Sequence, residues 1–162
     1  MKVAVTGGAG YLGSILCRKL LENHHVVVLD NILYGIDPIS SLLSNPKFTL
    51  IEGDIRDMRS LTKALKGADA VIHLASIVGD QSSDLDKNSA IEINYLATKV
   101  LLDLCDLYKI KKFLYASTCS VYGESPKYHM SENGFVGVTE QLQLPKPVSL
   151  YGETKLKSEE VI

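Results

Sequence analysis

The chain has 162 residues, 46% of them hydrophobic, and a formal net charge of −2 at pH 7. These values predict one domain over residues 1–162 with its own core, and they argue against nucleic-acid binding, which needs a basic surface. No apolar run approaches the length of about 20 consecutive residues that a membrane span needs. Its cysteines, Cys17, Cys105 and Cys119, lack metal-ligand spacing, which predicts reduced thiols in a cytoplasmic protein and no metal site.

Apolar runs of strand length alternate along the chain with segments of helical periodicity. The predicted strands lie at residues 2–6, 25–30, 48–54, 68–75 and 111–117. Apolar residues at helical spacing predict three helices. The first has an apolar face of Leu12, Ile15, Leu16 and Leu20, and the second has Leu61 and Leu65. The third, over residues 89–108, has Ile93, Val100, Leu101, Leu104 and Leu107. Strands separated by helices favour right-handed crossovers, so we expect an α/β fold with a doubly wound parallel sheet and helices on both faces.

The last third of the chain is less regular. Residues 124–150 contain three prolines and little periodicity, and a loop of that length in a compact domain is usually functional. The chain then stops within the opening turns of a predicted helix, before any sixth strand or substrate domain. The strand near residues 112–117 is therefore expected to have an unpaired edge.

A glycine cluster, Gly7, Gly8, Gly10 and Gly13, joins the first predicted strand to the first predicted helix. Its spacing fits both the dinucleotide fingerprint and its three-residue-spaced variant. The glycines permit a tight turn, let the backbone approach a pyrophosphate, and let the helix pack closely on the strand. Amide groups at the helix start would then face the phosphates, so the segment predicts a Rossmann-type site; the alternative is a glycine turn used only for packing.

Two aspartates end the next predicted strands. Asp30 stands at the expected offset of about 20 residues, where a carboxylate binds both ribose hydroxyls and repels a 2′-phosphate. No arginine follows it closely, so NAD is favoured over NADP; the alternative is an aspartate in a strand-end turn. Asp54 is expected either to meet the adenine amino group or to cap the helix that begins near Arg56.

A second group of residues has the chemistry of alcohol oxidation. Thr118 follows the fifth strand at the sheet edge where ligands bind, and Tyr151 and Lys155 stand four residues apart, on one face of a helix. We expect the ammonium to lower the pKa of the phenol, so that Tyr151 takes a proton from an alcohol as hydride leaves its carbon. Thr118 would hydrogen-bond the same oxygen. The alternative for this tyrosine–lysine pair is a solvated helix face.

The segments TGGAGYLG, GDIRD, HLAS, STCSVYG and YGETK appear in the order found in extended short-chain dehydrogenases/reductases, and the chain most resembles their nucleotide-sugar epimerase/dehydratase branch. The resemblance implies catalytic roles for Thr118, Tyr151 and Lys155, with Lys155 also reaching the nicotinamide ribose. It implies that Asn94 supports the active site. By position it implies NAD contacts from Gly7, Gly10, Tyr11, Leu12, Asp30, Asn31, Asp54, Ile55, Leu74, Ala75, Ser76, Asn94, Tyr151 and Lys155.

The chain departs from that pattern in two respects. Sugar 4,6-dehydratases of this branch place acidic residues directly after the catalytic threonine, whereas this chain has Cys119 and Ser120. That difference favours a nucleotide-sugar epimerase, with an NAD(P)-dependent reductase of a 4-keto sugar as the alternative. Full members are also roughly twice as long and bind the nucleotide sugar with their C-terminal portion. A non-catalytic NAD-binding fragment is therefore the third hypothesis.

Four weaker signals complete the sequence-based interpretation. Cys119 is expected to be a small strand-end residue facing the pocket rather than a nucleophile, and His73 to make a structural hydrogen bond. Tyr128 and His129 lie in the long loop that would border the substrate, without an assigned role. The helix over residues 89–108 is a candidate surface for a homodimer, because members of this family often pair through the helices beside their fourth and fifth strands.

Overall fold

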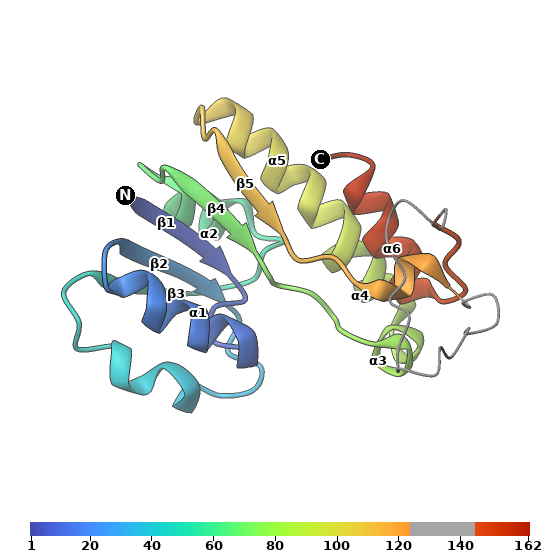
Figure 1. Cartoon of the computed structure of the whole chain (residues 1–162), viewed down its shortest axis with the longest axis horizontal. Helices are drawn as coiled ribbons and strands as arrows, with labels where there is room; N and C mark the ends of the chain where they lie inside the picture. The colour runs from blue at the N-terminus through green and yellow to red at the C-terminus, as the bar shows by residue number, and fades with distance from the viewer. Residues whose placement is uncertain (124–144) are drawn as a thin grey trace, which may run out of the picture.

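Five parallel strands form one sheet in the computed structural model, which describes residues 1–123 and 145–162. The strands are β1 (Lys2–Thr6), β2 (His25–Asp30), β3 (Phe48–Glu52), β4 (Ala70–His73) and β5 (Lys112–Tyr115). Their order is β3-β2-β1-β4-β5, so the chain winds outward from β1 in both directions (Figure 1). The predicted sheet is confirmed, although the last three strands end two residues before their predicted ends because the chain turns into loops at the carboxyl edge.

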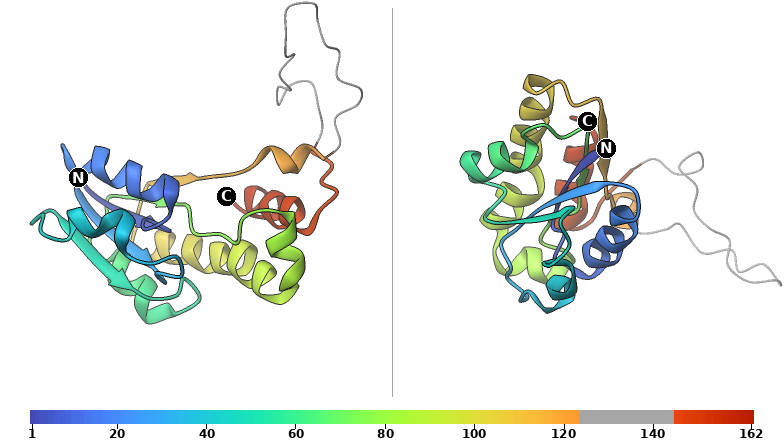
Figure 2. Two further views of the ribbon diagram at one scale, coloured as in Figure 1. Left: turned by 90° about the horizontal axis from the view of Figure 1, so that it is seen from below. Right: turned by 90° about the vertical axis from the view of Figure 1, so that its left-hand side faces the viewer.

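Helices cover both faces of this sheet. They are α1 (Tyr11–Leu21), the 3₁₀ helix η1 (Asp37–Leu42), α2 (Met58–Leu65), α3 (Asp80–Leu85), α4 (Lys87–Ile91), the π-helix η2 (Glu92–Leu96), α5 (Ala97–Leu107), the 3₁₀ helix η3 (Cys119–Tyr122) and α6 (Leu150–Glu159). α1 and η1 pack on one face, and α2 and α5 pack on the other (Figure 2). The chain therefore has the predicted doubly wound, Rossmann-type architecture.

Alternation along the strands separates two apolar cores. Val5 and Val28 face α1, whereas their neighbours Ala4 and Leu29 face α2 and α5. Leu61 and Leu65 of α2 are fully buried in the second core, as predicted. Strands buried on both faces read as continuous apolar runs, which is why such runs in the sequence identified them.

The predicted buried face of α1 is correct only in part. Leu20 is partly buried against the first core, but Leu12 and Ile15 are more than half exposed, and the fully buried residues of the helix are Gly13, Ser14, Cys17 and Leu21. The reason is close approach: a Cβ atom on Gly13 would collide with the Gly7 carbonyl oxygen, so this side of the helix must be small. Apolar periodicity does not detect a contact surface made of small residues.

The helix predicted over residues 89–108 is divided into α4, η2 and α5. Leu101 and Leu104 are buried as predicted and Ile93 and Val100 are partly buried, but Leu107 is 69% exposed. Pairing of two chains through this helix stays a prediction.

Helix α6 lies beyond the carboxyl ends of the strands, against α3, α4 and η2 (Figures 1 and 2). It also packs closely on η3, because a Cβ atom on Gly152 would lie 2.6 Å from the Ser120 carbonyl oxygen. The helix predicted at the end of the chain is thus confirmed. Within the described residues, β5 has no partner on its outer side, and no helix is both long and apolar enough to cross a bilayer. The expectations for the long loop, with Tyr128 and His129, lie outside the described residues.

Candidate active site

The glycine turn between β1 and α1 is held by backbone contacts. Gly7 has a φ of +74°, which favours glycine, and its amide donates a 2.9 Å hydrogen bond to the Leu29 carbonyl. A Cβ atom on Gly7 would lie 2.6 Å from the Ala75 nitrogen, and one on Gly13 would meet the Gly7 carbonyl oxygen. Glycine at these two positions is therefore required by the packing of the protein itself.

Gly10 differs from its neighbours. A Cβ atom there would meet only the Gly7 carbonyl oxygen, at 3.4 Å, so its other side is open. Gly10 is also the N-cap of α1, and none of the described side chains caps this end or places an acidic group in its first turn. An uncapped, positive helix end beside open backbone fits a bound pyrophosphate. Tyr11 and Leu12, the next two residues, are 86% and 57% exposed at this end.

Asp30 ends β2 beside the glycine turn, as predicted. One of its carboxylate oxygens accepts a hydrogen bond from the Ala9 amide at 2.9 Å, and the other accepts one from the Ile32 amide at the same distance. These bonds fix the plane of the carboxylate and leave lone pairs for further donors. Asn31 is exposed, and its side-chain oxygen accepts a hydrogen bond from the Leu33 amide.

Asp54 lies in the loop after β3, and the expectation that it caps a helix is wrong because Asp57 caps α2. Arg56 instead binds both carboxylate oxygens of Asp54, at 3.0 Å through Nε and 2.7 Å through Nη2. These hydrogen bonds hold the pKa of Asp54 below its usual value. The Arg56 Nη1 also reaches the Glu92 carboxylate at 2.8 Å, which ties this loop to η2. Ile55 is buried in the second core.

The residues after β4 are half-buried and linked to β1. The Ala75 amide donates to the Thr6 hydroxyl at 3.3 Å, and that hydroxyl lies 2.5 Å from His73 Nδ1. His73 Nε2 lies 3.0 Å from the Thr98 hydroxyl of α5, so His73 makes structural hydrogen bonds, as predicted. Burial lowers the pKa of His73 to about 3, with a smaller contribution from the Lys155 charge, so the ring is neutral.

Asn94 connects this segment to α6. Its side-chain oxygen accepts hydrogen bonds from the Ser76 hydroxyl at 2.9 Å and the Ile77 amide at 2.8 Å. Its side-chain amide donates to the Ile77 carbonyl at 3.0 Å and to the Thr154 hydroxyl at 3.3 Å. The Asn94 backbone carbonyl accepts a 2.6 Å hydrogen bond from the Ser158 hydroxyl. Asn94, 1% exposed, thus fixes α6 against the loop after β4.

Thr118 lies close enough to Tyr151 for its hydroxyl to act on the phenol and lower the phenol's pKa. Thr118 caps η3, where its hydroxyl accepts from the Ser120 amide at 3.2 Å, and Ser149 caps α6 by accepting from the Gly152 amide at 3.2 Å. Both caps fix backbone positions on either side of the pair. Tyr151 and Lys155 are both buried on the inner side of α6, so the alternative of a solvated helix face is excluded.

The expected lowering of the Tyr151 pKa is wrong for the protein without ligands. Burial raises the pKa of Tyr151, and the hydrogen bond from Thr118 only partly opposes that effect. Lys155 does not act on the phenol here, because its Nζ lies over the Tyr115 ring, 4.0 Å from the centroid. Burial lowers the pKa of Lys155 to about 8, and Glu159 partly opposes that shift.

Comparison with known proteins gives these elements a context. Residues 3–162 match the model of the NAD-dependent epimerase/dehydratase family. The chain belongs to that family.

Its relatives within the family include sugar-nucleotide epimerases. The chain is 36% identical over 99% of its length to an uncharacterised UDP-glucose epimerase of Bacillus subtilis, and covers 50% of that protein. It is 39% identical, with a TM-score of 0.86, to UDP-glucuronic acid 4-epimerase of Bacillus cereus in complex with UDP-glucuronic acid and NAD, covering 99% of this chain and 51% of that one. It is 29% identical, with a TM-score of 0.87, to a dTDP-glucose 4,6-dehydratase of Streptomyces venezuelae with NAD bound. The chain thus spans about half the length of these relatives.

The sequence-based interpretation missed six residues that contact the predicted site residues or link them to other elements. They are Thr6, Arg56, Thr98, Tyr115, Thr154 and Ser158. Two of them lie about one helical turn from a residue already singled out: Thr98 follows Asn94 by four positions, and Ser158 follows Lys155 by three. Polar residues repeated at helical spacing next to a predicted site residue were the available signal.

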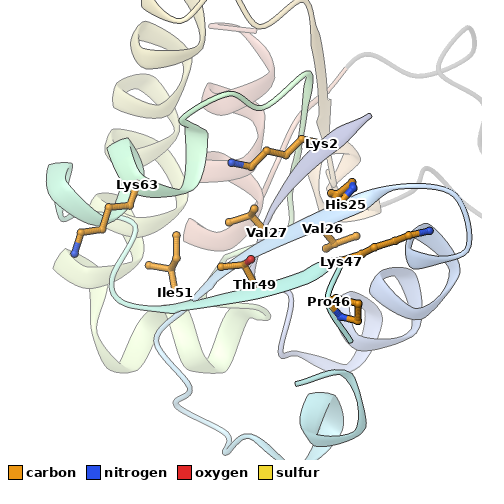
Figure 3. Close-up of a pocket in the computed structure, with 9 residues that line it drawn as sticks. All are labelled: Lys2, His25, Val26, Val27, Pro46, Lys47, Thr49, Ile51 and Lys63. Carbon is orange, nitrogen blue, oxygen red and sulfur yellow. The ribbon is translucent and has the colours of Figure 1, made fainter. Parts of the chain in front are cut away.

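A shallow pocket elsewhere on the chain belongs to a different part of the sheet. It is lined by Lys2, His25, Val26, Val27, Pro46, Lys47, Thr49, Ile51 and Lys63 (Figure 3). Lys2 and His25 begin β1 and β2, whereas Thr49 and Ile51 lie along β3 and Lys63 lies on α2, so this pocket runs from the amino ends of the strands along the α2 side of β3. The predicted site residues lie at the opposite, carboxyl edge, where ligands of open α/β sheets bind.

Proposed function

We propose that this chain is the NAD-binding and catalytic portion of a nucleotide-sugar 4-epimerase. The observation that carries this proposal is the proximity of Thr118 to the buried Tyr151, together with Cys119 and Ser120, rather than acidic residues, directly after Thr118. A dehydratase needs groups that move protons at the neighbouring sugar carbons, and neither a thiol nor a hydroxyl suits that work. The UDP-sugar 4-epimerases among the similar proteins support the same conclusion.

In this proposal NAD lies across the carboxyl edge of the sheet. Gly7 and Gly10 give its pyrophosphate access to the amides at the start of α1, with Tyr11 and Leu12 beside it. Asp30 and Asn31 receive the adenosine ribose, and Asp54 and Ile55 border the adenine. Leu74, Ala75 and Ser76 line the route toward the nicotinamide, and Lys155 holds the nicotinamide ribose. Because Asp30 repels a 2′-phosphate, NAD is preferred over NADP.

The chain's own residues then act on the sugar C4 hydroxyl. Tyr151, as phenolate, takes the hydroxyl proton, and Thr118 hydrogen-bonds the same oxygen and fixes its position. Bound NAD supplies the hydride acceptor and afterwards the hydride donor. Tyr151 returns its proton to the C4 oxygen once the 4-keto sugar has turned over and presents its other face. Because burial raises the pKa of Tyr151, the phenolate needs a nearby positive charge, which Lys155 supplies.

The decisive experiment replaces Tyr151 with Phe in the full-length protein. We expect 4-epimerisation of UDP-glucose or UDP-glucuronic acid to fall by about 10²- to 10⁴-fold, with NAD affinity nearly unchanged. The matched control is Tyr108→Phe, at the far end of α5. Unchanged turnover in Tyr151→Phe would refute the mechanism.

The same assay separates the two rival functions. An epimerase interconverts the sugars without net consumption of NADH. Stoichiometric oxidation of NADH or NADPH by a 4-keto sugar, without epimerisation, would instead indicate a reductase. NAD binding without conversion of any UDP-sugar in a panel would indicate a non-catalytic NAD-binding protein.

A further inference from the structure

Lys155 is held in an unusual environment for a lysine. Only 3% of the residue is exposed, and among the described residues no carboxylate lies within 4.0 Å of its ammonium. Burying an ammonium without an ion-pair partner is costly, so some other group must stabilise the charge. The group facing Lys155 Nζ is the ring of Tyr115, the last residue of β5.

The Tyr115 ring lies between two titratable groups from different elements. Its centroid is 4.0 Å from Lys155 Nζ and 5.6 Å from the ring of His73 on β4. The other groups near Lys155 lie on its own helix: Tyr151 is one turn before it and Glu159 one turn after it. His73 is neutral and the Tyr151 phenol is not ionised, so neither offers a negative charge.

We propose that Tyr115 is a positioning residue that keeps the Lys155 ammonium charged and in place at the carboxyl edge of the sheet. This inference rests on the proposed function for the part that Lys155 plays in catalysis. A cation within about 6 Å of an aromatic centroid is attracted to the negative face of the ring, most strongly where water is excluded. Tyr115 thereby replaces the carboxylate that a buried lysine usually requires.

A carboxylate in this position would serve catalysis less well than a ring. An ion pair would neutralise the field of the ammonium and weaken its effect on the Tyr151 phenol, whereas a ring carries no net charge. The charge of the ammonium then still acts on a ribose hydroxyl or the phenol when these come within reach. Burial already lowers the pKa of Lys155 to about 8, so the margin that keeps it charged at neutral pH is small.

The test changes the electrostatics of the ring without changing its shape. Tyr115→Phe serves as the reference, and trifluorinated phenylalanine at the same position has a similar shape but a weakened negative face. The pKa of Lys155 is read from the side-chain resonances of isotope-labelled lysine in the full-length protein, assigned by their loss in Lys155→Met. We expect Tyr115→Phe to stay near the parent value and the fluorinated variant to titrate about one pH unit lower. Equal Lys155 pKa values in the two variants would overturn the proposal.

Tyr95 provides the matched control, because Lys99 Nζ lies 5.7 Å from its ring centroid on the outside of the helix. Fluorination at position 95 should leave the Lys155 titration unmoved. A pH profile of UDP-sugar epimerisation gives a second readout, whose lysine-dependent limb should shift in step with the Lys155 pKa. If the pKa falls while no UDP-sugar is converted by the parent, Tyr115 positions Lys155 but the proposed function is wrong. If the parent epimerises and the pKa stays fixed, the role of Tyr115 is wrong.

Discussion

The glycine turn and the group of buried residues packed around α6, which we call the α6 wall, are held in shape by different physical interactions. The turn, residues 7–13, is continuous in sequence, and steric contacts between backbone atoms fix its shape. The wall gathers His73, Asn94, Tyr115, Thr118 and Lys155 from separate elements, and it holds them by buried side-chain hydrogen bonds and a ring contact. A site built from backbone is insensitive to pH, whereas one built from buried polar side chains depends on their protonation.

The largest effect is expected within the turn itself. Gly13→Ala places a Cβ atom against the Gly7 carbonyl and should lower the free energy of unfolding by about 3 kcal/mol or more, since neither backbone segment can move aside. Gly10→Ala is the matched control, because its open side should limit that cost to less than about 1 kcal/mol.

Denaturant unfolding and NAD titration of the full-length variants check this contrast. Gly10→Ala should bind NAD at least about tenfold more weakly, because the new methyl group occupies the space proposed for the pyrophosphate. Equal NAD affinity in Gly10→Ala and the parent would show that the pyrophosphate does not bind beside Gly10.

Lys155→Met tests whether burying the Lys155 ammonium in the α6 wall lowers the stability of the protein. The pKa of Lys155 lies near 8, below its ordinary value, so unfolding takes up a proton between about pH 8 and 10.5 and the parent gains stability across that window. Below pH 8 the parent bears the full cost of burying the charged Lys155, so the variant should be more stable than the parent by up to about 3 kcal/mol at pH 7. Unfolding free energies at pH 7 and pH 10 should show this gain shrinking as the pH rises. A variant less stable than the parent at pH 7 would contradict the idea.

His73 makes the same wall sensitive to acid. Its pKa near 3 in the folded chain lies below its ordinary value of 6.5, so the unfolded state binds more protons as the pH falls through 6.5. About 2 kcal/mol of stability should be lost from this residue between pH 7 and pH 5. His73→Gln should lose correspondingly less over that range, while His25→Gln, at an exposed position, should follow the parent. Identical pH slopes in all three proteins would show that His73 is not buried as a neutral ring.

Arg56 joins the loop after β3 to η2 and should have the smallest effect. Its ion pairs with Asp54 and Glu92 are partly exposed, so Arg56→Ala should cost less than about 1 kcal/mol, and less again at high salt. Arg59→Ala, an exposed neighbour, is the control. A loss that persists undiminished in 1 M salt would mean that packing, not charge, accounts for the role of Arg56.

The same contrast explains which parts of the molecule the sequence predicted well. The strands, the glycine turn and Asp30 are local features, in which a run of residues and its spacing determine the structure. The tyrosine–lysine pair was also found from spacing. The buried face of α1 was predicted only in part, because Gly13, Ser14 and Cys17 pack through small size rather than apolar character.

The α6 wall was harder to predict because its contacts join residues far apart in the chain. Nothing near Lys155 in the sequence indicates that its ammonium faces Tyr115, 40 positions earlier, since that contact exists only when α6 lies over the end of β5. The pKa of Tyr151 was predicted wrongly for the same reason: spacing places the two side chains on one helix face, but burial and the partner of Lys155 come from other elements. Long-range burial, not local pattern, decides protonation.

The π-helical turn at Glu92–Leu96 has a consequence for how this chain tolerates insertions and deletions. A π-turn holds one more residue than an α-turn over nearly the same length of axis, so removing one residue would let α4 and α5 join as one regular helix. Such a helix would form readily and would leave α4 and α5 in nearly the same relation, but the residues of the turn itself, Asn94 among them, would be rearranged. Asn94 could no longer meet both Ile77 and Thr154 while Thr98 meets His73. A deletion that improves the local helix would thereby disconnect the loop after β4 from α6, so the length of this segment is more tightly constrained than its helical propensity.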